Sequence, residues 1–234
     1  SQFKVQEDFW GKRYVMKSFQ DEYKFGSSAD LGVSVAYKFN KVVSADVIVA
    51  ALGESAEMSG ESSSRTDIQI PDAQKDLLKA LVATGKPVIL ALFTGRPLDL
   101  CWESEHVPAI LNVWFAGSEA GDAIADVMFG DMSPSGKLTT SFPRAVGQLP
   151  LYYNFKTSGR RYEYSDLEYY PLYYFGYGLS YTSFEYSDLK VEERENGNII
   201  AHVNVKNIGH RAGDEVVQLY VTDMYASVKT RITE

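Results

Sequence analysis

The chain has 234 residues, and its 45% apolar and 23% charged residues are typical of a folded globular protein. The formal net charge of −8 argues against binding to nucleic acid or to an anionic membrane surface, because both require basic patches. With a single cysteine, Cys101, the sequence predicts neither an internal disulfide nor a cysteine-based zinc site.

Residues 45–130 alternate between short apolar runs and segments with helical periodicity. Three runs have the length and composition of buried strands: 45–52, 87–94 and 108–115. Two helices are predicted, at residues 71–84 and 118–129, and a glycine follows each of them as a stop. Strands that alternate with helices predict an α/β fold, a mostly parallel sheet with helices on both faces.

A polar loop follows each of the three predicted strands. The loops are residues 53–67, 95–97 and 116–121. In a parallel sheet the carboxyl ends of the strands share one edge, and open α/β sheets bind their ligands there. We therefore expect the functional site at this edge.

The remaining segments are less regular. Residues 131–183 are rich in proline, glycine, serine and tyrosine, and residues 35–43 are expected to form a helix that leads into the first strand. From about Phe184 the pattern becomes β-like, and alternation at residues 199–206 and again at 217–221 predicts a partial β-sandwich. The predicted domains are an unassigned lead-in (1–44), an α/β sandwich (45–183) and an incomplete β-sandwich (184–234).

Three segments of the sequence, taken in order, are similar to segments of a known protein family. They are ADVIVAALGES with SGESSSRTDIQIP (45–55 and 59–71), TGKPVILALFTGRPL (84–98), and WFAGSEAGDAIADVMFGDMSPSGKLTTSFPRAVGQLP (114–150) continuing to FGYGLSYTSF (175–184). In this order they resemble glycoside hydrolase family 3. A weaker similarity, in VNVKNIGHRAGDEVVQLYV (203–221), resembles the fibronectin type III-like domain of bacterial β-glucosidases in that family.

The resemblance implies a retaining β-glucosidase that acts on β-linked gluco-oligosaccharides or aryl glucosides, needs no cofactor, and works in the periplasm or outside the cell. It implies an active site shared between residues 45–183 and an N-terminal (β/α)8 barrel domain. The barrel would hold the nucleophile and is not contained in these residues, so that this polypeptide alone is expected to be inactive.

The resemblance also implies that the acid/base carboxylate lies on the loop after the first strand. A glutamate a few residues before an aspartate and the Ile-Gln-Ile-Pro end favours Glu61, and Glu54 is the alternative. Arg65 either contacts the substrate or pairs with Asp67 to stiffen the loop. Arg96, in the Gly-Arg-Pro turn, is expected to be a scaffold residue.

A different class of function remains open from the residues alone. Most of the 16 tyrosines lie within residues 152–186, and aromatic faces can stack on sugar rings. The alternative is therefore a non-catalytic module that binds carbohydrate or a protein partner through this aromatic segment.

Overall fold

The computed structural model describes residues 5–7, 13–15, 33–38, 46–154, 164 and 166–221, and the chain divides into two compact units. Unit 1 comprises residues 1–118, 142–150 and 163–172, and unit 2 comprises residues 119–141, 151–162 and 173–234. Near the N-terminus, strands β1 (Val5–Glu7) and β2 (Arg13–Val15) form an antiparallel pair. None of the helices in the described ranges is both long and apolar enough to cross a membrane.

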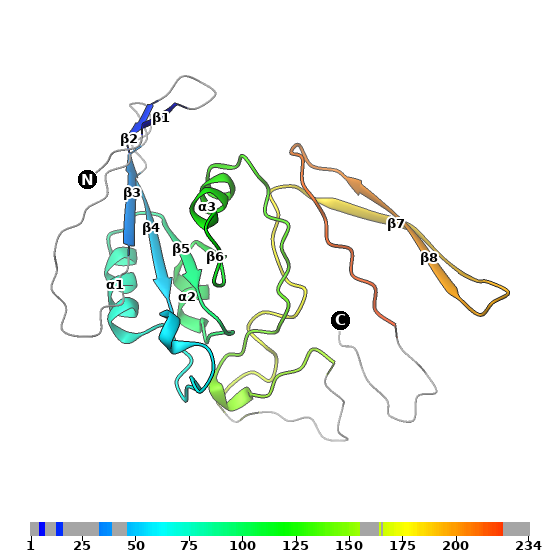
Figure 1. Ribbon diagram of the computed structural model, residues 1–234, viewed down its shortest axis with the longest axis horizontal. Coiled ribbons are helices and arrows are strands. Elements are labelled where there is room, and N and C mark those ends of the chain that lie inside the picture. The colour runs from blue at the N-terminus through cyan, green and yellow to red at the C-terminus, as the bar shows by residue number, and fades with distance from the viewer. Residues whose placement is uncertain are drawn as a thin grey trace. The chain divides into compact units, whose positions relative to one another are not determined.

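The main sheet of unit 1 has four strands in the order β3-β4-β5-β6 (Figure 1). They are β3 (Val33–Lys38), β4 (Asp46–Gly53), β5 (Val88–Phe93) and β6 (Ala109–Asn112). Strands β4, β5 and β6 are parallel, and β3 is antiparallel to β4. Strand β6 is shorter than expected, because Trp114 has a φ of 56° and extended backbone does not adopt that value. The predicted α/β fold with a mostly parallel sheet is confirmed.

The prediction of a helix at residues 35–43 is wrong for those of its residues that the structure describes. Residues 33–38 form β3, which pairs with β4 from Val33 opposite Ala51 to Lys38 opposite Asp46; residues 39–43 lie outside the described residues. The β-branched valines of this segment favour extended backbone. Pairing with β4 decides the conformation, and a short window of sequence does not reveal such a partner.

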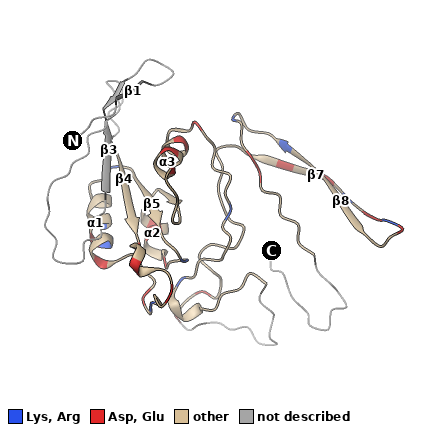
Figure 2. Ribbon diagram, viewed as in Figure 1, with Lys and Arg blue, Asp and Glu red and all other residues tan. Residues whose placement is uncertain are grey.

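Strands β4 and β5 supply most of the core of unit 1. The core side chains of β5 are at most 1% exposed: Val88, Leu90, Ala91 and Leu92. Strand β5 is uncharged along its length, whereas the loop after β4 carries charges of both signs (Figure 2). Helix α1 (Asp72–Ala83) packs against β4 and contributes the fully buried Leu78. Its bounds agree with the prediction, and the sequence did not predict helix α2 (Cys101–His106), whose six residues are too few to show a period.

Unit 2 contains helix α3 (Ala120–Phe129) and a two-stranded antiparallel sheet of β7 (Phe184–Glu193) and β8 (Ile199–Asn207). Helix α3 ends at Gly130, whose φ of 82° matches the predicted stop. The alternation at 199–206 is confirmed as β8. The prediction of a strand at residues 217–221 is wrong, because these residues have no regular secondary structure. Alternation shows which side chains could share a face, but a strand also needs a neighbour to pair with.

Candidate active-site loop

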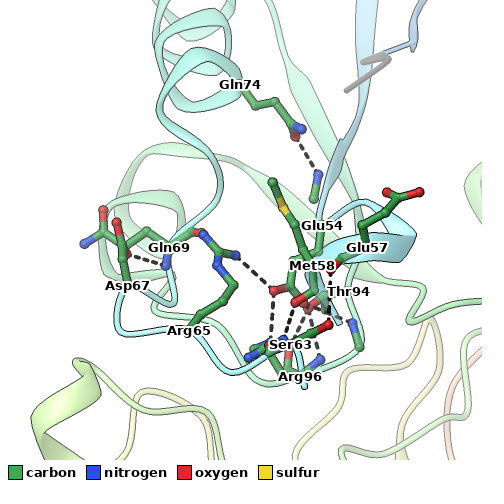
Figure 3. A network of polar contacts seen from close by, with 12 residues as sticks. Glu54, Glu57, Met58, Ser63, Arg65, Asp67, Gln69, Gln74, Thr94 and Arg96 are labelled. Atoms are coloured by element: carbon green, nitrogen blue, oxygen red, sulfur yellow. Dashed lines mark hydrogen bonds and ion pairs between the residues drawn. The ribbon is translucent and has the colours of Figure 1, made fainter. Parts of the chain in front are cut away.

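The loop that follows β4 starts from a rigid position at the carboxyl edge of the sheet. Gly53 lies opposite Phe93 in the parallel register, and the backbone N–H of Glu54 donates to Phe93 O at 2.8 Å. Gly53 has a φ of 144°, and a Cβ at this position would lie 1.8 Å from Phe93 O, so the backbone tolerates only glycine. From α1, Gln74 Oε1 accepts a hydrogen bond from Gly53 N at 2.7 Å (Figure 3). Strand β4, strand β5 and helix α1 together fix the backbone position of Glu54.

The Glu54 carboxylate is the centre of a polar network (Figure 3). Its side chain is fully buried, and Arg65 Nη1 donates to Oε1 at 2.9 Å. Arg96 Nε also lies 2.9 Å from Oε1, as an ion pair in which the N–H is not aligned for a hydrogen bond. The other oxygen, Oε2, lies 2.9 Å from Thr94 Oγ1 and accepts from Gly95 N at 3.3 Å. Four groups therefore converge on one carboxylate, and the side chain that carries it is not exposed to a substrate.

Arg96 connects this network to the two limbs of the loop, which are the residues before Glu61 and the residues after it. Its Nη2 donates to the carbonyl oxygen of Met58 on one limb, and to Ser63 O on the other at 2.8 Å. The Ser63 hydroxyl lies 3.2 Å from Glu57 O and 3.3 Å from Glu61 O, which ties the limbs together again. The carbonyls on both sides of Glu61 are thus held by one guanidinium and one hydroxyl.

Glu61 lies in the turn between these limbs. Ser63 N donates to Gly60 O at 3.3 Å, and Ser62 has a left-handed φ of 58°. The Glu61 side chain is exposed. A carboxylate that projects from a turn of this kind is free to meet a ligand or another domain.

The other charged residues of the loop have different surroundings. Glu57 lies in the short helix η1 (Ala56–Met58) and is exposed, and hydrogen bonds from its own backbone and from Ser55 hold the pKa of its carboxyl below the usual value. Asp67 Oδ1 accepts from Gln69 N at 2.9 Å. Arg65 is bound to Glu54 instead of Asp67, and its Nη2 also donates to Gln69 O at 3.4 Å.

The structure thus separates the two candidate glutamates that the sequence analysis placed on this loop. Glu54 is enclosed at the base and Glu61 is exposed at the turn. Sequence reasoning missed Thr94 and Gly95 as partners of Glu54. The parallel register contains the missing signal, since residues that directly follow two paired parallel strands must be neighbours.

Comparisons with known proteins identify relatives of most of the chain. The family model for the glycosyl hydrolase family 3 C-terminal domain matches residues 24–181. A protein of Salmonella typhimurium named periplasmic β-glucosidase is 49% identical over 203 residues, which cover 81% of this chain and 26% of the relative. A β-xylosidase of Formosa agariphila is 47% identical over 191 residues, covering 78% of this chain and 26% of the relative.

A solved structure has the same fold over a similar extent. The crystal structure of a variant β-glucosidase from Listeria innocua in complex with laminaribiose matches with a TM-score of 0.72 at 42% identity. The match covers 79% of this chain and 27% of that chain. This chain therefore spans about a quarter of the length of the proteins it resembles.

Proposed function

The chain belongs to glycoside hydrolase family 3, and from that premise we propose that it supplies the general acid/base carboxylate, Glu61, to a retaining β-glucosidase. The observation that carries this proposal is the contrast on one loop between an exposed glutamate at the turn and an enclosed glutamate at the base. A proton donor has to come within hydrogen-bond reach of the oxygen that it protonates. Glu61 can be approached in this way and Glu54 cannot.

Glu57 is the other exposed glutamate of the loop, and it is less suited to the role. A general acid must carry its proton when the substrate binds, and the pKa of Glu57 is lowered by its hydrogen bonds. Glu61 is therefore the residue to which we assign the proton transfer.

The proposed reaction follows the two-step course of retaining glycosidases. In the first step Glu61 donates its proton to the glycosidic oxygen, the bond from C1 to that oxygen breaks, and the electron pair stays on the departing oxygen. A nucleophilic carboxylate forms the new bond to C1. In the second step the Glu61 carboxylate takes a proton from a water whose oxygen bonds to C1, and the nucleophile leaves.

The second carboxylate is proposed to come from an N-terminal (β/α)8 barrel domain. Retaining enzymes place their two carboxyl groups about 5–5.5 Å apart. The buried carboxylate of this loop, Glu54, is bound to Arg65 and Arg96 and is not available as a nucleophile. A barrel that faces the carboxyl edge of this sheet would face the loop on which Glu61 is exposed.

The substrate is proposed to be a β-glucoside with a terminal, non-reducing glucosyl residue. One relative is named a β-glucosidase, and the matched structure was solved with laminaribiose. Another relative is named a β-xylosidase, so a β-xyloside is the substrate to test beside it. A periplasmic or extracellular location is proposed from the name of the Salmonella relative.

Arg65 is proposed to support the loop. Its Nη1 is bound to Glu54 and its Nη2 to Gln69 O, and its side chain is 20% exposed. A contact between Arg65 and the sugar, which the sequence analysis considered, would have to use the remaining donors of the guanidinium.

The test of the proposal is the dependence on the leaving group in the protein that includes the barrel. Glu61→Gln should reduce kcat/KM for cellobiose by about 10²–10⁴-fold, the usual contribution of general acid–base catalysis. It should reduce cleavage of dinitrophenyl β-glucoside much less, because that phenolate leaves without protonation. Azide should restore turnover of the activated substrate, since an anion attacks C1 without help from a base.

Glu57→Gln is the matched control, because Glu57 is an exposed glutamate on the same loop. It should retain the wild-type ratio of the two activities. If Glu61→Gln also keeps that ratio, Glu61 is not the acid/base. If Glu54→Gln instead gives the dependence and the azide rescue, the role belongs to Glu54.

A further inference from the structure

We propose that Glu54 and Arg96 act as positioning residues, which fix the turn that presents Glu61 to the substrate. This inference rests on the proposed role of Glu61. It assigns a function to the enclosed carboxylate at the base of the loop, which takes no part in proton transfer.

The first step of the argument is the position of Arg96 between the limbs of the loop. Nη2 of one guanidinium donates to Met58 O and to Ser63 O, which lie on either side of Glu61. Two carbonyls that share one donor nitrogen must stay close together. The width of the loop at its base, and with it the direction in which the turn projects, is set by Arg96.

The second step is the attachment of Arg96 to the sheet. Its Nε lies 2.9 Å from Glu54 Oε1, while Nη2 of the same guanidinium donates to the loop carbonyls. Glu54 is held by the N–H of Gly95 and lies beside the Thr94 hydroxyl, both of which directly follow β5. The chain of contacts therefore runs from a rigid strand end through Glu54 and Arg96 to the loop. Sites supported in this way keep the geometry that proton transfer needs.

The third step concerns charge. Arg65 and Arg96 both lie 2.9 Å from the same oxygen of Glu54, so two cations share one anion. If Glu54 lost its charge, the two guanidinium groups would face each other without a counter-ion. Each would turn toward solvent, and Arg96 would release Met58 O and Ser63 O.

The experiment compares two substrates in the protein that includes the barrel, with Arg96→Lys as the main variant. Lysine keeps the charge beside Glu54 but has no fork that can hold two carbonyls as well. We expect kcat/KM for cellobiose to fall by about 10–10²-fold, the effect of a small misplacement of a catalytic group. Cleavage of dinitrophenyl β-glucoside should change little, and the loss should be in kcat. A variant that merely folds poorly would lose both activities equally.

Two further variants keep the inference open to contradiction. Glu54→Asp shortens the carboxylate arm and should lower the ratio of the two activities in the same direction as Arg96→Lys. In the double variant Glu61→Gln/Arg96→Lys, the second substitution should cost nothing more on cellobiose, because residues that act through one another are not additive. Lys79→Arg, an exchange of one cation for the other on the exposed side of α1, is the control and should leave the ratio unchanged.

The outcomes separate this inference from the proposed function. If Glu61→Gln shows the leaving-group dependence but a folded Arg96→Lys keeps the wild-type ratio, the positioning role is wrong and the role of Glu61 stands. An additive loss in the double variant also overturns the positioning role. If Glu61→Gln shows no dependence, the proposed function fails first and this inference fails with it.

Discussion

Two glutamates of unit 1, Glu54 at the sheet edge and Glu103 in α2, both have fully buried side chains. Around Glu54 the structure places Arg65, Arg96, a hydroxyl and a backbone N–H. Neither carboxyl oxygen of Glu103 has a hydrogen-bond partner in the described chain, and Lys75 Nζ is 4.0 Å away. Burial alone therefore does not define the state of a carboxylate; the donors around it do.

The two environments have opposite consequences. Glu54 is useful as an anion, because its charge holds two guanidinium groups beside the loop. For Glu103, burial raises the pKa of the carboxyl, and the ammonium of Lys75, 4.0 Å away, acts against that rise. The Glu54 carboxylate organises its surroundings, whereas burial acts against the charged form of Glu103.

Removal of the Glu54 side chain is expected to have the largest effect. Glu54→Ala should lower the free energy of unfolding by about 3–5 kcal/mol, because it leaves two partly buried cations without their partner. Urea denaturation measures this loss. Glu57→Ala, an exposed position on the same loop, should leave the midpoint unchanged, and equal midpoints for the two variants would show that the network contributes little.

A smaller effect is expected when one neighbour of Glu54 is removed. The Thr94 side chain is fully buried, and its hydroxyl lies 2.9 Å from Glu54 Oε2 and 2.7 Å from Arg96 O. Thr94→Val keeps the shape of the side chain and removes its hydroxyl. The buried carboxylate of Glu54 then has one polar neighbour fewer, as the carboxylate of Glu103 has none within hydrogen-bond distance among the described residues. The free energy of unfolding should fall by about 1–3 kcal/mol. A neutral result would mean that the guanidinium groups alone satisfy the carboxylate.

Much of the fold could be predicted from the sequence, because buried parallel strands and amphipathic helices leave periodic signals. Strands β4 and β5 and helices α1 and α3 follow from apolar runs and glycine stops. Strand β3 could not be predicted, since its conformation depends on pairing with β4. The wrong strand at 217–221 is also an alternating pattern, and it pairs with no strand among the described residues.

For the site, the sequence predicted the loop but not the arrangement within it. The edge follows from parallel strands, and the family resemblance limits the candidates to two glutamates. Which of them is enclosed depends on the path of the backbone, above all on the close approach of Gly53 to Phe93. The choice of Glu54 over Asp67 as the partner of Arg65 is likewise a matter of three-dimensional distance.

The smallest predicted effect is a gain in stability at Glu103, and it tests the other half of the comparison. Burial raises the folded-state pKa of this carboxyl above its value in the unfolded chain. The folded state therefore binds the proton more tightly than the unfolded chain does. The stability that this tighter proton binding contributes is complete below the unfolded pKa and is lost as the pH rises through the folded pKa. Above the folded pKa the buried carboxylate has the ammonium of Lys75 4.0 Å away and no hydrogen-bond partner among the described residues.

Glu103→Gln removes this charge and resembles the protonated acid in shape. At pH 7 we expect the variant to be more stable than the wild type by about 1 kcal/mol, since a neutral group replaces a poorly paired buried ion. The difference should shrink as the pH falls through the folded pKa of the wild-type carboxyl, because the protonated acid and the glutamine are both neutral. Glu105→Gln, an exposed position on the same helix, should show no such pH dependence. A loss of stability for Glu103→Gln at pH 7 would mean that the ammonium of Lys75, 4.0 Å away, stabilises the carboxylate more than burial penalises it.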